Sequence, residues 1–255
     1  MTTMSRVLHL LTVPLLCARV GMGQAGDGED CGGQSVPPKV EDVHTMCDLA
    51  RQLRALETAS QSAVTAVVAF AREASEAKER AEKAVGRAKS KNRGVDVATE
   101  AAARAGAAAQ RAETAVSDAK KHAANLTAVS KDAVETTDES LRLLATCEKA
   151  DEPIRTAAEK CTGAAADVTS KSLESALNAF AELVPDDADE IREHGMVFVA
   201  GLKSLEDDVR MAGEAKYEAE KAEGDASDAA DGARAVLTSG CVLSFLAAVH
   251  FTAVL

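Results

Sequence analysis

Residues 100–120 read EAAARAGAAAQRAETAVSDAK, and alanine is almost the only non-polar residue among them. Alanine is the strongest helix former, yet its methyl group buries little surface. Aromatic residues make up only 2% of the 255-residue chain, and Trp is absent. Such a composition is typical of long packed helices or of disorder, and the spacing of the apolar residues distinguishes the two.

Apolar residues recur at alternating intervals of three and four through two long segments. The first series is apolar at every position but Ser60, and consists of Leu49, Leu53, Leu56, Ser60, Ala63, Val67, Phe70, Ala74, Ala77, Ala81, Ala84 and Ala88. The second consists of Ala98, Ala101, Ala105, Ala108, Ala112, Ala115, Ala119, His122, Leu126, Val129, Ala133, Thr136, Ser140, Leu143 and Cys147. A disordered chain does not sustain such a repeat, so the pattern predicts two long helices that pack along their length.

The two series are separated by KSKNRG, residues 89–94, which interrupts the helical pattern. Folding the chain there places the alanine halves of both helices side by side and brings Leu56 near Leu126 and Leu143. We therefore predict an antiparallel hairpin, thin at the tip and thicker at the base, with helices of ~50 residues and ~75 Å. The basic tip is typical of a solvated turn, a binding epitope being the alternative.

A shorter second hairpin is predicted after DEPIRT, residues 151–156, because Pro153 cannot lie inside a helix. The third helix then runs from Ile154 to Val184, and DDADE, residues 186–190, begins the fourth. The apolar series of the fourth helix includes Phe198, Leu202, Leu205, Val209, Ala212 and Ala219. The fold class expected is all-α, an elongated antiparallel bundle over 39–222 that runs up, down, up, down. The first hairpin would then project past the second.

Both ends of the chain differ from the middle. Residues 1–23 have a basic start, an apolar run and small residues, which is the layout of a secretory signal peptide. Residues 24–38 are rich in Gly, Asp and Pro, so we expect a flexible N-terminal segment. Residues 223–231 are expected to form a stalk, followed by an apolar tail in 232–255.

Small residues, a spacer and a terminal apolar run together indicate a glycosylphosphatidylinositol (GPI) attachment signal. The attachment residue expected is Asp231 or Gly232, with Asp228 and Ser239 as alternatives, and 232–255 are removed. A C-terminal membrane helix is the alternative, but the apolar run is shorter than the ~20 residues that a span requires. The expected location is the extracellular face of the plasma membrane. In this arrangement the cysteines and the lipid gather at one end, and residues 89–94 stand farthest from the membrane.

Charge and cysteine content follow from this processing. Removal of Arg6, Arg19 and Arg234 leaves 26 basic and 41 acidic residues, a formal charge of −15. Such a chain repels nucleic acid, so its contact with the membrane must come from the lipid. The cysteines that remain are Cys31, Cys47, Cys147 and Cys161, which predict two disulfides of unknown pairing. A zinc site is the rival interpretation, but no CxxC or paired histidine spacing is present.

No catalytic or cofactor motif is present. His44, His122 and His194 fall on separate predicted helices, and His122 in the apolar series is interpreted as a core residue. Asn125 begins the one N-x-[ST] sequon and is a candidate glycosylation site. We expect no enzyme activity, metal or cofactor.

These features together resemble the alanine-rich, GPI-anchored coat proteins of trypanosome insect stages, the glutamic acid/alanine-rich protein family. The resemblance rests on the signal peptide before Gln24, the alanines of 74–88 and 98–119, the sparse cysteines and the tail after Asp231. It implies an extended helical bundle that forms a protective surface layer. Its expected partners are neighbouring coat proteins and a host or vector tissue ligand. The alternative is a receptor for a host protein or nutrient, but Phe70, Phe180 and Phe198 are assigned to the core, which leaves few aromatic anchors.

Overall fold

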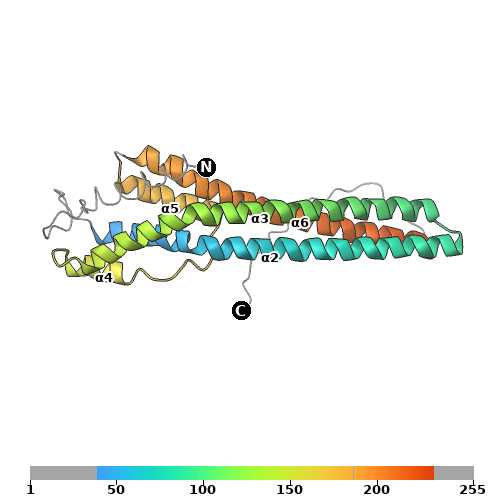
Figure 1. The fold of residues 1–255 in the computed structure, drawn as a ribbon, viewed down its shortest axis with the longest axis horizontal. Helices are drawn as coiled ribbons and strands as arrows, with labels where there is room; N and C mark the ends of the chain where they lie inside the picture. The colour runs from blue at the N-terminus through green and yellow to red at the C-terminus, as the bar shows by residue number, and fades with distance from the viewer. Residues whose placement is uncertain (1–38, 186, 233–255) are drawn as a thin grey trace.

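The computed structural model describes residues 39–185 and 187–232, and the regular elements in these ranges are all helices (Figure 1). Three are long, namely α2 (Val40–Lys91), α3 (Val95–Thr146) and α6 (Ala188–Asp231). Two are short, namely α4 (Glu152–Glu159) and α5 (Ser170–Leu183). The prediction of an elongated, all-α antiparallel bundle is confirmed.

The hairpin of α2 and α3 forms as its sequence predicts. Glu41 and Asp42 lie in the first turn of α2, and the Asp42 carboxylate accepts the backbone N–H of Lys39 at 2.8 Å. At the other end, Asn92 and Gly94 adopt left-handed backbone conformations with φ of 48° and 61°, which glycine tolerates best. A Cβ on Gly94 would also lie 2.3 Å from the carbonyl oxygen of Ala229. The turn therefore lies directly against the end of α6.

Alanines form the core of the narrow half of the molecule, which we call the stem and define as residues 71–112 and 215–232. Each of the three long helices contributes a column of buried alanines at helical spacing. The main members are Ala74, Ala77, Ala81, Ala84 and Ala88 on α2, Ala98, Ala101, Ala105, Ala108 and Ala112 on α3, and Ala215, Ala219, Ala222, Ala226 and Ala230 on α6. Because these side chains are small, the three helix backbones can lie close together.

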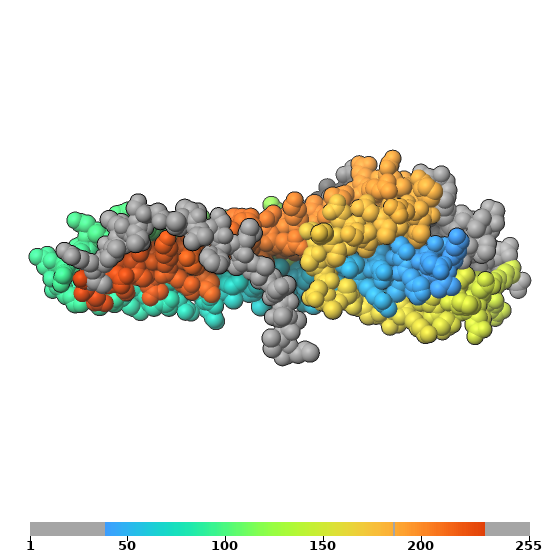
Figure 2. Space-filling model, turned by 180° about the vertical axis from the view of Figure 1, so that it is seen from behind, coloured from blue at the N-terminus to red at the C-terminus, as the bar shows by residue number. Residues whose placement is uncertain are grey.

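The remaining described residues form the head, where the core is built from larger side chains. Leu56, Leu126, Leu173 and Leu205 are each at most 1% exposed. α5 packs antiparallel on the first half of α6, since the Ser170 amide donates to Glu206 at 2.8 Å and Leu177 covers Gly195. Figure 2 shows the broader head, with α5 and the start of α6 beside α2, and the narrower stem.

The route of the chain through the second half differs from the expectation. The predicted third helix is two short helices, α4 and α5, separated by residues 160–169. α5 and α6 do form a shorter second hairpin, but α6 extends past the end of α5. In all, α6 has 44 residues and is ~66 Å long. Residues 223–231, expected to be a stalk, are instead the last turns of α6. α2 and α6 therefore run from the head toward the tip of the stem, and α3 and α5 run in the opposite direction. The order is up, down, down, up instead of up, down, up, down.

The register of α3 also departs from the simple repeat. Leu143 is 37% exposed, whereas Leu141 and Leu144 are buried. The buried positions alternate by three and four over 98–119 and again over 126–144, but the second run is shifted by one residue. Such a shift is a stutter in the seven-residue repeat. It turns Leu143 out of the core and Leu144 inward.

Candidate functional site

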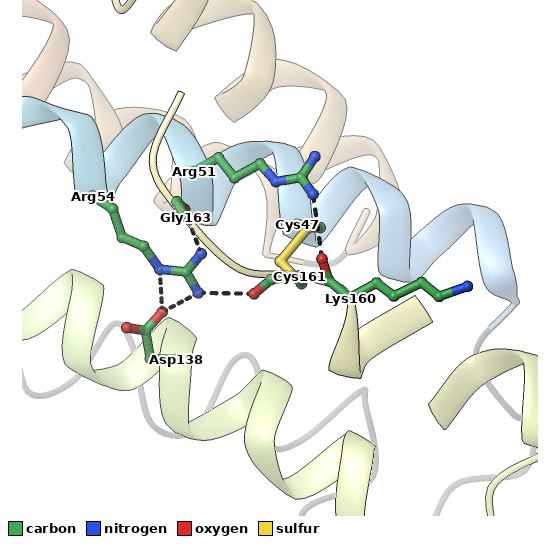
Figure 3. Close-up of a disulfide and its surroundings, with 7 residues drawn as sticks. All are labelled: Cys47, Arg51, Arg54, Asp138, Lys160, Cys161 and Gly163. Carbon is green, nitrogen blue, oxygen red and sulfur yellow. Dashed lines mark hydrogen bonds and ion pairs between the residues drawn. A yellow bond between two sulfur atoms is a disulfide. The ribbon is translucent and has the colours of Figure 1, made fainter. Parts of the chain in front are cut away.

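A disulfide fastens the start of α2 to the segment that follows α4. Cys47 and Cys161 are bonded, with a Cα–Cα distance of 5.4 Å and a sequence separation of 114 residues (Figure 3). Both cysteines are buried. Such a long loop is the kind whose closure restricts the unfolded chain most. The disulfide thus fixes the far end of the head.

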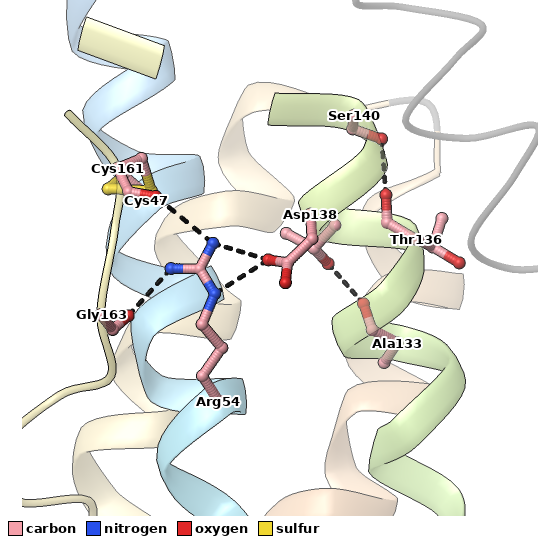
Figure 4. A network of polar contacts seen from close by, with 9 residues as sticks. Cys47, Arg54, Ala133, Thr136, Asp138, Ser140, Cys161 and Gly163 are labelled. Atoms are coloured by element: carbon pink, nitrogen blue, oxygen red, sulfur yellow. Dashed lines mark hydrogen bonds and ion pairs between the residues drawn. A yellow bond between two sulfur atoms is a disulfide. The ribbon is translucent and has the colours of Figure 1, made fainter. Parts of the chain in front are cut away.

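Arg54 forms a second link beside the disulfide, and its Nη2 also donates to the Cys161 carbonyl at 3.4 Å. Its Nε and Nη2 donate to one oxygen of Asp138 on α3 at 2.9 and 2.6 Å, and its Nη1 donates to the Gly163 carbonyl at 2.9 Å (Figure 4). Arg51 supports the same segment, because its carbonyl accepts the Ala165 amide at 2.9 Å. A guanidinium suits this position because its donors point in several fixed directions. We call residues 160–165 the strap.

Buried hydroxyls near the Arg54 cluster are satisfied within α3. Ser140 donates to the Thr136 carbonyl at 2.9 Å, as Figure 4 shows, and Thr137 donates to the Ala133 carbonyl at 2.6 Å. These bonds remove the cost of burying a polar group without a partner. The cluster is therefore built as a packed structural element.

His122 and Asp208 form a polar pair inside the bundle, between α3 and α6. His122 Nδ1 lies 2.8 Å from Asp208 Oδ2. The Asp208 side chain is only 8% exposed, and that of His122 is 34% exposed. His122 is therefore only half-buried and lies at the edge of the core, and the sequence reasoning missed its acidic partner.

Ion pairs attach α6 to both other helices along the stem. Arg80 binds Glu223 at 2.8 Å and Arg104 binds Asp225 at 3.0 Å. Further pairs join Arg111 to Glu218, Lys216 to Glu73, and Lys91 to Asp231. The hydrogen bond to the Glu73 carboxylate raises the pKa of Lys216. These pairs fix the register of an α6 segment whose alanines alone specify it weakly.

The expected GPI attachment residues lie at the tip of the stem. Asp231, the last residue of α6, accepts a hydrogen bond from Lys91 Nζ at 2.8 Å. Gly232 has a φ of 75°, and a Cβ there would lie 2.5 Å from the Arg93 guanidinium carbon. This position corrects the expectation that the cysteines and the attachment residues share one end. Residues 89–94 lie beside Asp231, and the Cys47–Cys161 disulfide lies at the opposite end.

The other predicted site residues are spread over the molecule. Asn125 is exposed on α3, and Cys147 is disulfide-bonded, whereas Cys31 lies outside the described residues. His44 is exposed, and His194 contacts the Glu190 carbonyl. In residues 39–185 and 187–232, no group of His, Cys, Asp and Glu side chains is placed to hold a metal ion. Within the same ranges no helix is long and apolar enough to cross a membrane.

Sequence reasoning missed the ion pair of Arg54 with Asp138, which we call the clamp, and the full extent of α6. The two residues of the clamp are 84 positions apart, and no local sequence pattern indicates that they meet. The extent of α6 did have a signal, because Ala222, Ala226 and Ala230 continue the spacing of the earlier buried alanines.

Comparison with solved structures places this architecture among trypanosome proteins. GARP from Trypanosoma congolense is 85% identical, with a TM-score of 0.71 over 72% of this chain and 100% of that one. A metacyclic invariant surface protein from Trypanosoma brucei is 26% identical, with a TM-score of 0.71 over 76% and 96%. The Trypanosoma brucei factor H receptor, bound to domain D5 of bovine factor H, is 26% identical, with a TM-score of 0.70 over 75% and 94%. No curated protein sequence matches.

The fold and the clamped head thus define an elongated, disulfide-stapled helical bundle of the trypanosome type. The family model for the glutamic acid/alanine-rich protein of Trypanosoma matches residues 40–224. The chain belongs to this family.

Proposed function

We propose that the protein is an abundant, GPI-anchored coat protein of the parasite surface. Residues 1–23 direct secretion, and 232–255 are exchanged for the lipid at Asp231 or Gly232. The protein then stands on the extracellular face of the plasma membrane, where its neighbours in the layer are other coat proteins. Membership of the family supports this proposal, as does the similarity to a surface protein of Trypanosoma brucei.

The position of Asp231 at the tip is the observation that carries the proposal. A lipid on Asp231 or Gly232 would place the turn at residues 92–94 next to the membrane, because Gly94 contacts Ala229 and Arg93 contacts Gly232. The stem would then stand on the membrane and hold the head outward. A helix of 52 residues is ~78 Å long, so the molecule would stand about that tall. Its stem is only three helices across. A tall, narrow molecule makes a thick layer from closely spaced copies.

The surface of the head suits a protective role. Phe180 and Phe198 are 6% and 7% exposed, so they are not available as binding anchors. Binding sites concentrate their energy in exposed aromatic and arginine side chains. Tyr217 is the most exposed of the large apolar side chains among the described residues, but it lies on the stem.

A receptor for a host protein is the second candidate. It is supported by the factor H receptor, which has a similar fold and 26% identity. An outward-facing head would display Met196 and Val197 of α6, which are 44% and 43% exposed. A ligand in host or vector tissue would contact this part of the molecule.

Two modifications belong to the proposal. Asn125 is exposed and carries the glycan, and Cys31 pairs with Cys147, because Cys47 and Cys161 are already joined. Peptide mapping without reduction should recover a Cys31–Cys147 peptide pair. A glycosidase should shift the mass of the peptide that contains Asn125.

Phospholipase C treatment of intact parasites tests the anchor. We expect release of a protein that ends at Asp231 or Gly232 by mass spectrometry. Retention on the membrane with Val242–Leu255 still attached would overturn the anchor. Counting copies per cell separates the two functions, since a coat protein must be among the most abundant surface proteins and a receptor need not be.

A further inference from the structure

One stretch of α2 carries no charge. Residues 58–71, TASQSAVTAVVAFA, contain no Asp, Glu, Lys or Arg, although these residues make up 27% of the chain. The stretch is not simply buried. Its exposed residues are Thr58, Gln61, Ser62, Thr65 and Val68.

The neighbouring part of α3 has the same character. Residues 122–130 also lack Asp, Glu, Lys and Arg. A groove runs between the two segments, and its lining includes Ser60, Val64, Thr65, Ala124 and Thr127. We call residues 58–71 and 122–130 together the neutral band. Lys120 and Lys131 line the groove on either side of the α3 segment.

Ser60 adds a polar feature to the floor of this groove. It is 1% exposed, and its Oγ is the one buried side-chain oxygen or nitrogen without a hydrogen-bond partner among the described residues. An unsatisfied buried hydroxyl costs about 1–3 kcal/mol. The buried serines and threonines of α3, by contrast, avoid this cost by bonding to their own helix, as Ser140 and Thr137 do.

The proposed coat places identical rods side by side with the same end on the membrane. Where two copies meet through the same face, related by a two-fold axis along the rods, each residue approaches its own equivalent. On a charged face this brings like charges together, which is unfavourable. With a formal charge of −15 after processing, the rods repel one another over most of their length. The neutral band is a face on which two copies can touch without bringing Asp, Glu, Lys or Arg of the band together, and Lys120 and Lys131 lie at its edges.

We propose that the neutral band is the contact surface between neighbouring copies of this protein in the coat. The inference rests on the proposed function and adds to it the partner and the surface. Two bands related by a two-fold axis along the rods would bury Val68, Thr65 and the groove against their equivalents. Asn125 is exposed within the band but does not line the groove.

Site-specific crosslinking of the full-length protein on living parasites tests the contact. Thr65→Cys places a thiol in the groove, and Thr114→Cys, farther from the membrane end than the turn at 92–94, is the matched control. Both threonines are exposed on a helix, and each donates to the carbonyl four residues earlier, at 2.8 and 3.0 Å. With a short bis-maleimide we expect several-fold more homodimer from T65C than from T114C. Equal yields would mean that crosslinking reflects density alone, and a T65C product containing another protein would also overturn the proposal.

A charge variant provides a second measurement. Val68→Glu in the T65C background should reduce the homodimer several-fold, because it places two carboxylates face to face. Val197→Glu is its control, since Val197 is also an exposed valine, 43% exposed like Val68. An unchanged yield with V68E would refute the contact.

The outcomes separate this inference from the proposed function. Phospholipase release with equal crosslinking at both positions overturns the contact and leaves the anchored coat intact. Failure of release with the lipid tail attached overturns the anchor, whatever the crosslinking yields.

Discussion

Lys91 and Asp231 are 140 residues apart in sequence, yet their side chains meet at 2.8 Å. Lys91 is the last residue of α2 and Asp231 is the last residue of α6. Both helices therefore run from the head to the tip, while α3 returns between them. An odd number of long helices places the C-terminal end of the described bundle opposite the Cys47–Cys161 disulfide. The direction in which the molecule stands on a membrane follows from this one relationship.

The fastening of the α6 end should depend on pH. The hydrogen bond from Lys91 lowers the pKa of the Asp231 carboxyl from its ordinary value of 3.8. A carboxyl with a lowered folded-state pKa contributes stability above its unfolded pKa, and loses it as the pH falls through the folded value. Hydrogen exchange of the last turns of α6 should therefore accelerate below about pH 4 beyond the intrinsic pH dependence. Lys91→Gln should abolish this acceleration, and its persistence in that variant would assign the effect to another group.

The alanine core of the stem should tolerate no larger side chain. Ala101 is 0% exposed between three helices, so Ala101→Leu must push them apart. We expect a loss of about 1–3 kcal/mol in the free energy of unfolding, measured by chemical denaturation. Ala103→Leu is the control, because Ala103 is exposed on the same helix. Equal stability of the two variants would show that the stem is loosely packed.

The sequence predicted the elements whose information is local and repeated. The alternating spacing in α2 and α3, the turn at 89–94 and the acidic start of α6 at Asp189 and Glu190 are all present. Each is specified by residues within a few turns of one another. Leu143 is the exception, because the buried positions of α3 shift by one residue between Ala119 and Leu126, and a strict repeat does not anticipate that shift.

The course of the second half could not be predicted in the same way. The strap at 160–165 is held by Arg54 from α2, a contact between residues more than a hundred positions apart. Likewise, the alanines near the end of α6 fit a stalk or a helix equally well by composition, and only their spacing indicates the helix. The end of α6 is helical because its alanines pack against buried residues of the other helices, such as Ala88 and Ala98. Ion pairs such as Arg80 with Glu223 add to this packing.

The Cys47–Cys161 disulfide should be a major source of stability in the head. Replacing both cysteines by serine opens a loop with a sequence separation of 114 residues. We expect a loss of about 2–5 kcal/mol in the free energy of unfolding. Hydrogen exchange should rise most in α4 and the strap, with the stem amides least affected. A uniform rise along the whole molecule would show instead that head and stem unfold as one unit.

Arg54 should not be replaceable by lysine. An ammonium is a single donor centre and cannot bind both the Asp138 carboxylate and the Gly163 carbonyl in the observed directions. Arg54→Lys should therefore lower the free energy of unfolding by about 1–3 kcal/mol, the scale of hydrogen bonds to charged groups. A double-mutant cycle with Asp138→Asn measures the part due to the ion pair. A coupling energy near zero would assign the loss to the strap contact alone.

The pair of His122 and Asp208 offers the last test, because removing one partner should cost more than removing both. His122→Ala leaves a carboxylate that is 8% exposed without its partner at 2.8 Å, so we expect a loss of about 1–3 kcal/mol. Asp208→Leu in the same background removes the stranded charge and fills the space with an apolar side chain. Thermal denaturation should then show a higher Tm for the double variant than for His122→Ala alone. If the double variant is instead the less stable of the two, the carboxylate is satisfied by water and the pair is not a core element.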